Sequence, residues 1–314
     1  MPESIAKTVS EGVHALHANT AGGRVRFRTD SPYIAISVHM GSVCKPAHFA
    51  TTGTMGFDMY SRENDREIFV GTFVPPSNVE DYYEGVIEFK SSKFGECEGK
   101  MRDITVNFPL YSNVREVYVG LDAAAVIEEP LPYKYDKPIL VYGSSVAQGG
   151  CASRPGNAYP SMIARRFNCD HINLGFSGNG KGEKEIAEYI AGLDMEVFVY
   201  AYDQNAPNME YLQKTHEPMF KIIREANPDL PVIMVTTTGL PRYQDDHNGR
   251  KKIIYNTYMN AIGSGDKNVY YVDGSDIFEG IGDVTVEGCH PNDLGFYLMA
   301  KNIGNVIGTI LRDK

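Results

Sequence analysis

Four short stretches of the sequence carry side chains that together could transfer an acyl group. Ser145 lies in VYGSSVAQGG, glycines fill NLGFSGNG, Asn205 lies in YDQNAP, and His290 lies in EGCHPNDLGF. A serine hydroxyl attacks a carbonyl when a base takes its proton, and the tetrahedral oxyanion then needs hydrogen-bond donors. The stretches supply a hydroxyl, backbone N–H groups, a side-chain amide and an imidazole. We therefore expect Ser145 to be a nucleophile and His290 its base.

A third group must orient the imidazole, and the sequence offers two carboxylates for this role. Glu287 stands three residues before His290 and would complete a Ser-His-Glu triad. Asp273, which follows an apolar segment, is the rival acid. A different group or a backbone carbonyl could also orient His290 while Glu287 points to solvent. We take Glu287 as the expected acid and keep these alternatives open.

The elements that would position these groups alternate between strand and helix in the second part of the chain. Five short apolar segments are expected to be strands: 138–143, 170–175, 196–202, 231–237 and 268–274. Four helices are expected before a last one that follows His290: 157–167, 183–191, 208–227 and 245–262. Pro218 would kink or break the third of them. This alternation predicts a parallel sheet covered on both faces, which binds ligands at the carboxyl ends of its strands.

The first part of the chain alternates apolar and polar residues, as antiparallel strands do. One strand-like run places Ile34, Ile36 and Val38 on the same face. Further runs, separated by turn-rich pieces, predict a β-sandwich of roughly 130 residues. The chain therefore divides into a β-sandwich accessory domain, 1–134, and a catalytic domain, 135–314.

These stretches, in this order, resemble the blocks of the SGNH (GDSL-like) hydrolases from Pro138 onward. In the first part, Gly56-Phe57-Asp58-Met59-Tyr60 resembles the Gly-x-Asp-Leu-Tyr motif of the β domain that precedes one SGNH subfamily. The resemblance implies a flavodoxin-like parallel five-stranded domain preceded by an antiparallel, jelly-roll-like β-sandwich. It also implies an oxyanion hole made by the N–H groups of Ser145 and Gly178 and by the amide of Asn205. Taken alone, Gly178 could serve a turn with positive φ, and Asn205 could cap the next helix.

The resemblance implies a serine esterase that removes small acyl groups, acetyl above all, from carbohydrate esters, with oligosaccharides as the expected substrates. Two alternatives stay open: a catalytically weakened carbohydrate-binding protein, and an acyltransferase that uses the same site. We expect the β domain to pack against the catalytic domain and to supply part of the cleft, with the loop Cys44–Thr54 as a contributor. Its alternative role is an interface in a homo-oligomer.

Composition excludes several other classes of function. The formal net charge of −10 without a basic cluster argues against nucleic acid, and no apolar run is long enough for a membrane span. The N-terminus lacks the basic and apolar regions of a secretory signal, so we expect a cytoplasmic protein. The 5 cysteines are scattered, and the other histidines lack the spacing of metal ligands, so the sequence predicts free thiols and neither metal nor cofactor.

Overall fold

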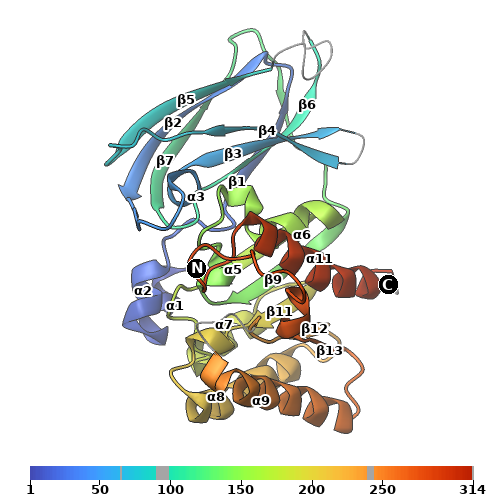
Figure 1. Ribbon diagram of the computed structural model, residues 1–314. Helices are drawn as coiled ribbons and strands as arrows, with labels where there is room; N and C mark the ends of the chain where they lie inside the picture. The colour runs from blue at the N-terminus through green and yellow to red at the C-terminus, as the bar shows by residue number, and fades with distance from the viewer. Residues whose placement is uncertain (64–65, 90–98, 239–243, 313–314) are drawn as a thin grey trace.

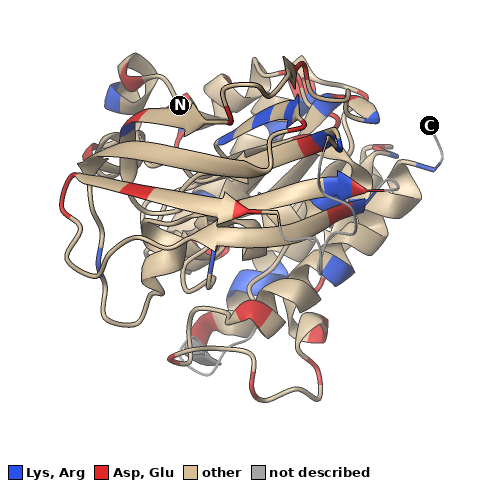
Figure 2. Cartoon of the chain, turned by 90° about the horizontal axis from the view of Figure 1, so that it is seen from above, with Lys and Arg blue, Asp and Glu red and all other residues tan. Residues whose placement is uncertain are grey.

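The chain folds into a β half and an α/β half that lie against each other (Figure 1). The computed structural model describes every residue except 64–65, 90–98, 239–243 and 313–314. None of the helices in the described ranges has the length and apolar content that crossing a bilayer requires. Lys and Arg stand among Asp and Glu in the view of Figure 2.

The β half is a sandwich of two antiparallel sheets. Its described strands are β1 (Arg24–Thr29), β2 (Tyr33–Ser42), β3 (Phe57–Glu63), β4 (Arg66–Phe73), β5 (Tyr82–Glu88), β6 (Arg102–Asn107), β7 (Asn113–Gly120) and β8 (Ile127–Glu128). One sheet has the order β4-β3-β6-β1-β8 and the other β5-β2-β7. Ile34, Ile36 and Val38 of β2 are buried between the sheets, as the alternating pattern predicted. A short helix, α3 (Thr51–Thr54), follows the loop after β2.

The α/β half is built on one parallel sheet. Its strands are β9 (Tyr135–Gly143), β10 (Cys169–Gly175), β11 (Val197–Ala201), β12 (Val232–Val235) and β13 (Val269–Val272). They lie in the order β10-β9-β11-β12-β13, and every pairing is parallel. This is the flavodoxin-like order with a switch point at β9, so the predicted fold class is confirmed. The carboxyl ends of β10, β9 and β11 are neighbours at one edge of the sheet.

Helices cover both faces of this sheet (Figure 1). The helical elements are α5 (Ser145–Gln148), η1 (Pro155–Asn157), α6 (Tyr159–Phe167), α7 (Lys184–Ala191), η2 (Asp203–Asn205), α8 (Met209–Ala226), α9 (Gln244–Gly263), α10 (Gly274–Ile277) and α11 (Asp293–Ile310). Val141 and Val199 face α6 and α11, whereas Tyr142 and Tyr200 face α7, α8 and α9. Successive strand residues therefore enter opposite cores, which explains why these strands are apolar throughout.

Helix α8 continues through Pro218, where the sequence suggested a kink or a break. A proline inside a helix costs about 3 kcal/mol because its N–H is missing and its ring crowds the preceding turn. Packing offsets this cost, since α8 buries Leu212, Met219 and Ile223 between its neighbours and Tyr200 Oη donates to the carbonyl of His216.

The first two helices, α1 (Glu3–Val9) and α2 (Glu11–Leu16), pack on the α/β half, although they lie inside the segment 1–134 that we assign to the β domain. Ala6 and Val13 are buried in the same core as the residues of α7 and α8. In Figure 1 the two helices lie at the side of the α/β half, with α1 next to α7. The alternating pattern of the strands gave no signal for this placement. The division at residues 134 and 135 itself stays a prediction.

Candidate active site

The first strand of the parallel sheet delivers Ser145 to the site. Strand β9 ends at Gly143, Ser144 caps α5 by accepting a hydrogen bond from the N–H of Val146 (3.2 Å), and Ser145 begins the helix. Ser144 is buried and its hydroxyl donates to Gln204 Oε1 (3.0 Å). The two adjacent serines therefore differ in environment, because Ser144 holds the turn while Ser145 faces a histidine.

His290 connects Ser145 to a carboxylate. Its Nε2 lies 2.9 Å from Ser145 Oγ, and its Nδ1 lies 2.6 Å from Glu287 Oε1. The N–H of His290 also donates to both oxygens of Glu287, at 3.2 Å each. Burial opposes a charge on the imidazole, but hydrogen bonds to Cys289 and Glu287 outweigh it and raise the pKa of His290 above its usual value. The glutamate is thus placed to stabilise the imidazolium.

Asp273, the rival acid, lies in a different environment. It caps α10 by accepting from the N–H of Ser275 (3.0 Å), and it forms an ion pair with Lys251 of α9. Of the two candidate carboxylates, the structure brings Glu287 into contact with His290.

The expected oxyanion donors come from three neighbouring loops. Gly178 has φ +70°, and a Cβ there would meet no heavy atom of the described residues within 4 Å, so the loop is open at this point. A Cβ at Gly180 would meet the carbonyl oxygen of Gly143 at 2.4 Å and Asn205 Nδ2 at 3.6 Å, which shows that the loops after β10, β9 and β11 touch. Only a glycine fits such an approach.

Asn205 ends η2 and its amide donates to the carbonyl oxygen of Phe176 (2.9 Å). An amide nitrogen carries two N–H groups, so this bond orients the side chain and leaves a second donor. The alternative interpretation of Asn205 as a helix cap is wrong, because Asn208 caps α8 by accepting from the N–H of Tyr211 (2.8 Å).

The sequence did not predict the hydrogen bonds that hold the segment containing Asn205. Asp203 is buried, and its carboxylate accepts from the N–H groups of Thr237 (2.8 Å) and Gln204 (3.0 Å). Arg250 reaches across from α9 and donates to the carbonyl oxygens of Asp203 (2.6 Å) and Ala206 (2.9 Å). Burial raises the pKa of Asp203 to about 6. These bonds fix η2, and the only hint of them in the sequence was a polar cluster after a strand.

The β half contributes aromatic side chains to the surroundings of His290. The rings of Phe49 and His48 lie 5.4 and 5.6 Å from the His290 ring, centroid to centroid. Tyr111 stacks edge-on against Phe49 (4.7 Å) and its hydroxyl donates to the carbonyl of Ser145 (3.2 Å). The loop Cys44–Thr54, expected to approach the cleft, thus contacts the ring of His290. The sequence did not indicate that Phe49 or His48 would lie next to His290.

Gly150 is the point at which these groups converge. A Cβ there would lie 2.9 Å from His290 Cδ2, 2.9 Å from the Tyr111 hydroxyl and 3.1 Å from Phe49 Cζ. We expect Gly150→Ala to displace the imidazole and to lower kcat by about 10- to 100-fold, since small misplacements of catalytic groups have effects of this size. Steady-state kinetics on an aryl acetate checks this.

Gly263→Ala is the matched control, because a Cβ at that exposed helix end meets no described atom within 4 Å. It should leave kcat unchanged. Equal kinetics for the two variants would contradict the close approach at Gly150.

Asp58 of the Gly-Phe-Asp-Met-Tyr motif links the two halves of the protein by hydrogen bonds. It is fully buried and accepts from Arg154 Nη1 (2.8 Å), the N–H of Gly156 (2.8 Å) and Asn107 Nδ2 (2.9 Å). The motif thus contributes to the packing of the two halves, since Arg154 and Gly156 follow α5 in the α/β half. The adjacent Ser153 and Asn157 in turn bond Asp293, at the start of the helix after His290.

Removing the positive partner of a buried carboxylate leaves an uncompensated charge. We expect Arg154→Ala to lower the free energy of unfolding by about 3 kcal/mol, the low end of the range for broken buried pairs, because two N–H donors remain on Asp58. Urea unfolding measures this. Arg166→Ala is the control: its exposed guanidinium bonds Asn305 and Lys301, so its loss should cost less than about 1 kcal/mol. Similar losses for both variants would contradict a special role for the buried pair.

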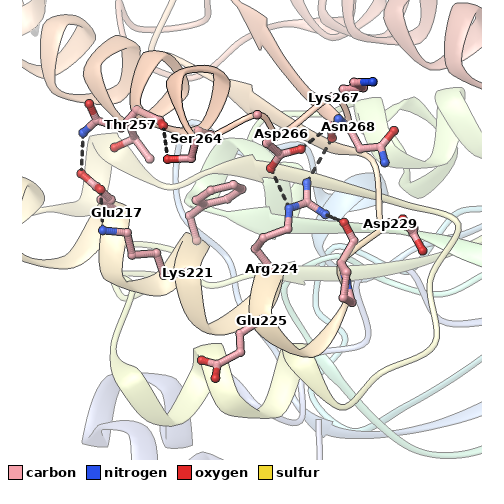
Figure 3. Close-up of a pocket in the computed structure, with 15 residues that line it drawn as sticks. Glu217, Lys221, Arg224, Glu225, Asp229, Thr257, Ser264, Asp266, Lys267 and Asn268 are labelled. Atoms are coloured by element: carbon pink, nitrogen blue, oxygen red, sulfur yellow. Dashed lines mark hydrogen bonds and ion pairs between the residues drawn. The ribbon is translucent and has the colours of Figure 1, made fainter.

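A separate cavity lies between α8 and α9, at the amino ends of β12 and β13 (Figure 3). It has a volume of about 570 Å³ and is lined by charged side chains of both signs. Its central Arg224 is held by Asp266 (2.8 Å) and donates to the carbonyl oxygens of Asn227 (2.9 Å) and Leu230 (2.6 Å). This cavity is at the opposite edge of the sheet from Ser145. Its arginine makes hydrogen bonds that hold the surrounding segments in place.

Two family models cover nearly the whole chain. The GDSL-like lipase/acylhydrolase family matches residues 136–308, just over half of the chain, and the N-terminal region of SGNH-hydrolase-type esterases matches residues 1–127. No protein of curated function matches the chain in sequence.

Solved structures show the same fold. A GDSL-like lipase from Bacteroides ovatus shares 28% identity over 98% of this chain and 90% of its own, with a TM-score of 0.88. A salicylyl-acyltransferase from a tetracycline biosynthetic pathway shares 20% identity over 96% and 86%, with a TM-score of 0.77. A family two carbohydrate esterase from Clostridium thermocellum, in complex with cellohexaose, shares 13% over 94% of each chain, with a TM-score of 0.66. On these matches the chain belongs to the GDSL-like lipase/acylhydrolase family, a family of carboxylic ester hydrolases, and carries the N-terminal β region of SGNH-type esterases.

Proposed function

We propose that this protein is a serine esterase that removes acetyl groups from carbohydrate esters, with Ser145, His290 and Glu287 as the catalytic triad. The observation that carries the proposal is the unbroken hydrogen-bonded series from Ser145 Oγ through the imidazole to Glu287. A serine hydroxyl bonded to a histidine whose second nitrogen faces a carboxylate is the arrangement that activates a nucleophile.

The reaction has two steps. Ser145 Oγ attacks the ester carbonyl while His290 Nε2 takes its proton, and the same proton then passes to the departing alcohol. Water, deprotonated by His290, then attacks the acyl-enzyme. The bond between Ser145 Oγ and the acyl carbon breaks, the acid leaves, and the proton on His290 returns to Ser145 Oγ. The oxyanion of each tetrahedral intermediate would be held by the N–H groups of Ser145 and Gly178 and by Asn205.

Asn205 gives a quantitative test of this oxyanion hole. Removing one donor that acts only in the transition state lowers kcat by about 10²- to 10³-fold. We expect Asn205→Ala to lower kcat by this factor with little change in KM. Asn208→Ala, which removes the cap of α8 and leaves the loops around Ser145 intact, is the control. A large rise in KM with unchanged kcat for Asn205→Ala would contradict a transition-state role.

The choice of a small acyl group and a carbohydrate alcohol rests on two supports. Phe49 and His48 crowd the imidazole, which favours a short acyl chain and offers rings on which a sugar can stack. Structures of the same fold include carbohydrate esterases and an acetyl xylan esterase from Butyrivibrio proteoclasticus. We test the proposal by following free acetate from a panel of acetylated oligosaccharides and from aryl esters of increasing acyl length. Preference for long acyl chains, or turnover of aryl acetates without any acetylated sugar, would contradict it.

A second candidate keeps the chemistry and changes the acceptor. A salicylyl-acyltransferase has a similar fold, which supports transfer of the acyl group to an alcohol as the alternative reaction. Product analysis with competing alcohols distinguishes the two, since a transferase yields the new ester in excess over the free acid. A catalytically weakened binding protein is the other alternative, and it would leave Ser145 unlabelled by a fluorophosphonate probe.

A further inference from the structure

Three cysteines that are far apart in the sequence gather around the candidate active site. Cys151 and Cys289 each lie close to His290. Cys44 packs against the hydrophobic cluster that contains Tyr111, whose hydroxyl donates to the carbonyl of Ser145. No two of the described cysteines are joined in a disulfide, and Cys169 is the one that lies on β10. Thiols and imidazoles are the ligands that zinc prefers in proteins. Two thiols, which are soft metal ligands, therefore lie beside the candidate base His290.

Two histidines and one of these thiols are close enough to share an ion. One ligand atom each from His48, Cys151 and His290 lies within 4.8 Å of the others. In a tetrahedral zinc site with bonds of about 2.0 to 2.3 Å, neighbouring ligand atoms are about 3.3 to 3.8 Å apart. A contraction of about 1 Å would thus complete three corners of a tetrahedron. The residues come from the β2–α3 loop, the turn after α5 and the loop before α11, which is why their sequence spacing gave no metal signal.

We propose that His48, Cys151 and His290 form an inhibitory zinc site that spans the two halves of the protein. Water or Glu287, which with Cys289 and His290 forms a second close group, would fill the fourth position. Binding would replace the S–H bond of Cys151 by a Zn–S bond and release one proton to the buffer. The inhibitory effect rests on the proposed triad, whereas the binding itself does not.

Inhibition follows from the bonds that His290 now makes. Its Nε2 faces Ser145 and its Nδ1 faces Glu287, at 2.9 and 2.6 Å. A nitrogen that donates its lone pair to zinc can neither accept a proton nor keep its hydrogen bond. Whichever nitrogen binds the ion, either the base or its orientation is lost, so the metal and catalysis exclude each other.

The local structure would allow a metal ion to enter the site from solvent. His48 is exposed, so an ion can reach its ring from solvent, while Cys151 is buried with its thiol donating to the carbonyl of His48 (3.4 Å). Cys151 also has φ +69°, a left-handed conformation that a cysteine rarely adopts. This backbone aims the thiol at the His48 loop.

The test is titration of the full-length, metal-free protein with Co²⁺, whose absorption reports thiolate bonds and four-coordinate geometry without any catalysis. We expect one Co²⁺ per chain with a thiolate-to-metal band, displaced by Zn²⁺. Cys151→Ser should remove the band, and His48→Gln should weaken Zn²⁺ binding by at least about tenfold. Cys169→Ala and His39→Gln, a buried thiol on β10 and an exposed histidine on β2, are matched controls that should bind like the parent protein.

Hydrolysis of an aryl acetate is then followed at increasing Zn²⁺, each variant being compared with its own metal-free rate. We expect loss of activity to parallel occupancy and to be reversed by a chelator. Binding without a thiolate band, a band retained by Cys151→Ser but lost in Cys289→Ser, or full activity with zinc bound would each overturn the proposal. If the protein hydrolyses no ester, the Co²⁺ titration still decides whether the site exists, so the two proposals fail separately.

Discussion

Ser145→Ala is expected to lower kcat/KM for an aryl acetate by about 10⁴- to 10⁶-fold, the range for loss of a serine nucleophile. The side chain lies 2.9 Å from His290 Nε2, so its removal leaves the base without a group to activate. Residual turnover would come from binding and the oxyanion donors acting on water. Binding of an uncleaved substrate analogue should persist, because the fold around Ser145 does not depend on its hydroxyl.

The neighbouring serine supplies the control. Ser144→Ala removes the cap of α5 and the bond to Gln204, which should cost about 1 kcal/mol of stability and change kcat/KM far less than Ser145→Ala does. A fluorophosphonate probe should label the parent protein and Ser144→Ala and fail to label Ser145→Ala. The reverse pattern would transfer the role of nucleophile to Ser144.

The sequence predicted those parts of the site whose positions are set by the ends of the parallel strands. Each expected donor or nucleophile stands just after an apolar strand, and parallel strands bring such positions to one edge. Residues 143–149 and 175–180, after neighbouring strands, therefore meet in the structure as the pattern required. His290 was also predictable, because its loop precedes a strongly periodic last helix.

Groups that act across long sequence separations could not be predicted in the same way. Arg250 reaches the carbonyl of Asp203 from a helix whose pattern shows only helicity, and Phe49 comes from the other half of the chain. The packing of α1 on α7 and the proximity of the thiols could not be predicted for the same reason. A local pattern reports which face of an element is apolar but not which partner covers it.

The hydrogen bonds between the two halves show what the Gly-Phe-Asp-Met-Tyr motif contributes to the structure. Buried Asp58 bonds Arg154 and Gly156, just after α5, and Ser153 in the same segment bonds Asp293 after His290. Removing one partner would therefore disturb both the packing of the β half and the segment that follows Ser145. This coupling is why the accessory half is expected to affect catalysis even where it makes no contact with substrate.

Glu287→Gln is expected to lower kcat by about 10²- to 10⁴-fold and to move the acidic limb of the pH profile to lower pH. The amide keeps the size of the side chain but can donate to His290 Nδ1, which favours the tautomer with the proton on Nε2, where a base needs a lone pair. The carboxylate also helps raise the pKa of His290, and the imidazole must be neutral to act as a base. The parent protein therefore loses activity as the pH falls through this raised pKa. Without the negative charge the imidazolium is less stable, its pKa falls, and the remaining activity persists to lower pH.

Asp273→Asn is the matched control, because it removes the rival carboxylate and its ion pair with Lys251 while leaving the bonds of His290 in place. Rates measured across pH for both variants, with the same aryl acetate, separate the two acids. An unshifted acidic limb with near-normal kcat for Glu287→Gln, together with a shift for Asp273→Asn, would identify Asp273 as the acid. The 2.6 Å contact predicts the opposite, since a carboxylate stabilises the imidazolium most strongly when it is hydrogen-bonded directly to the ring.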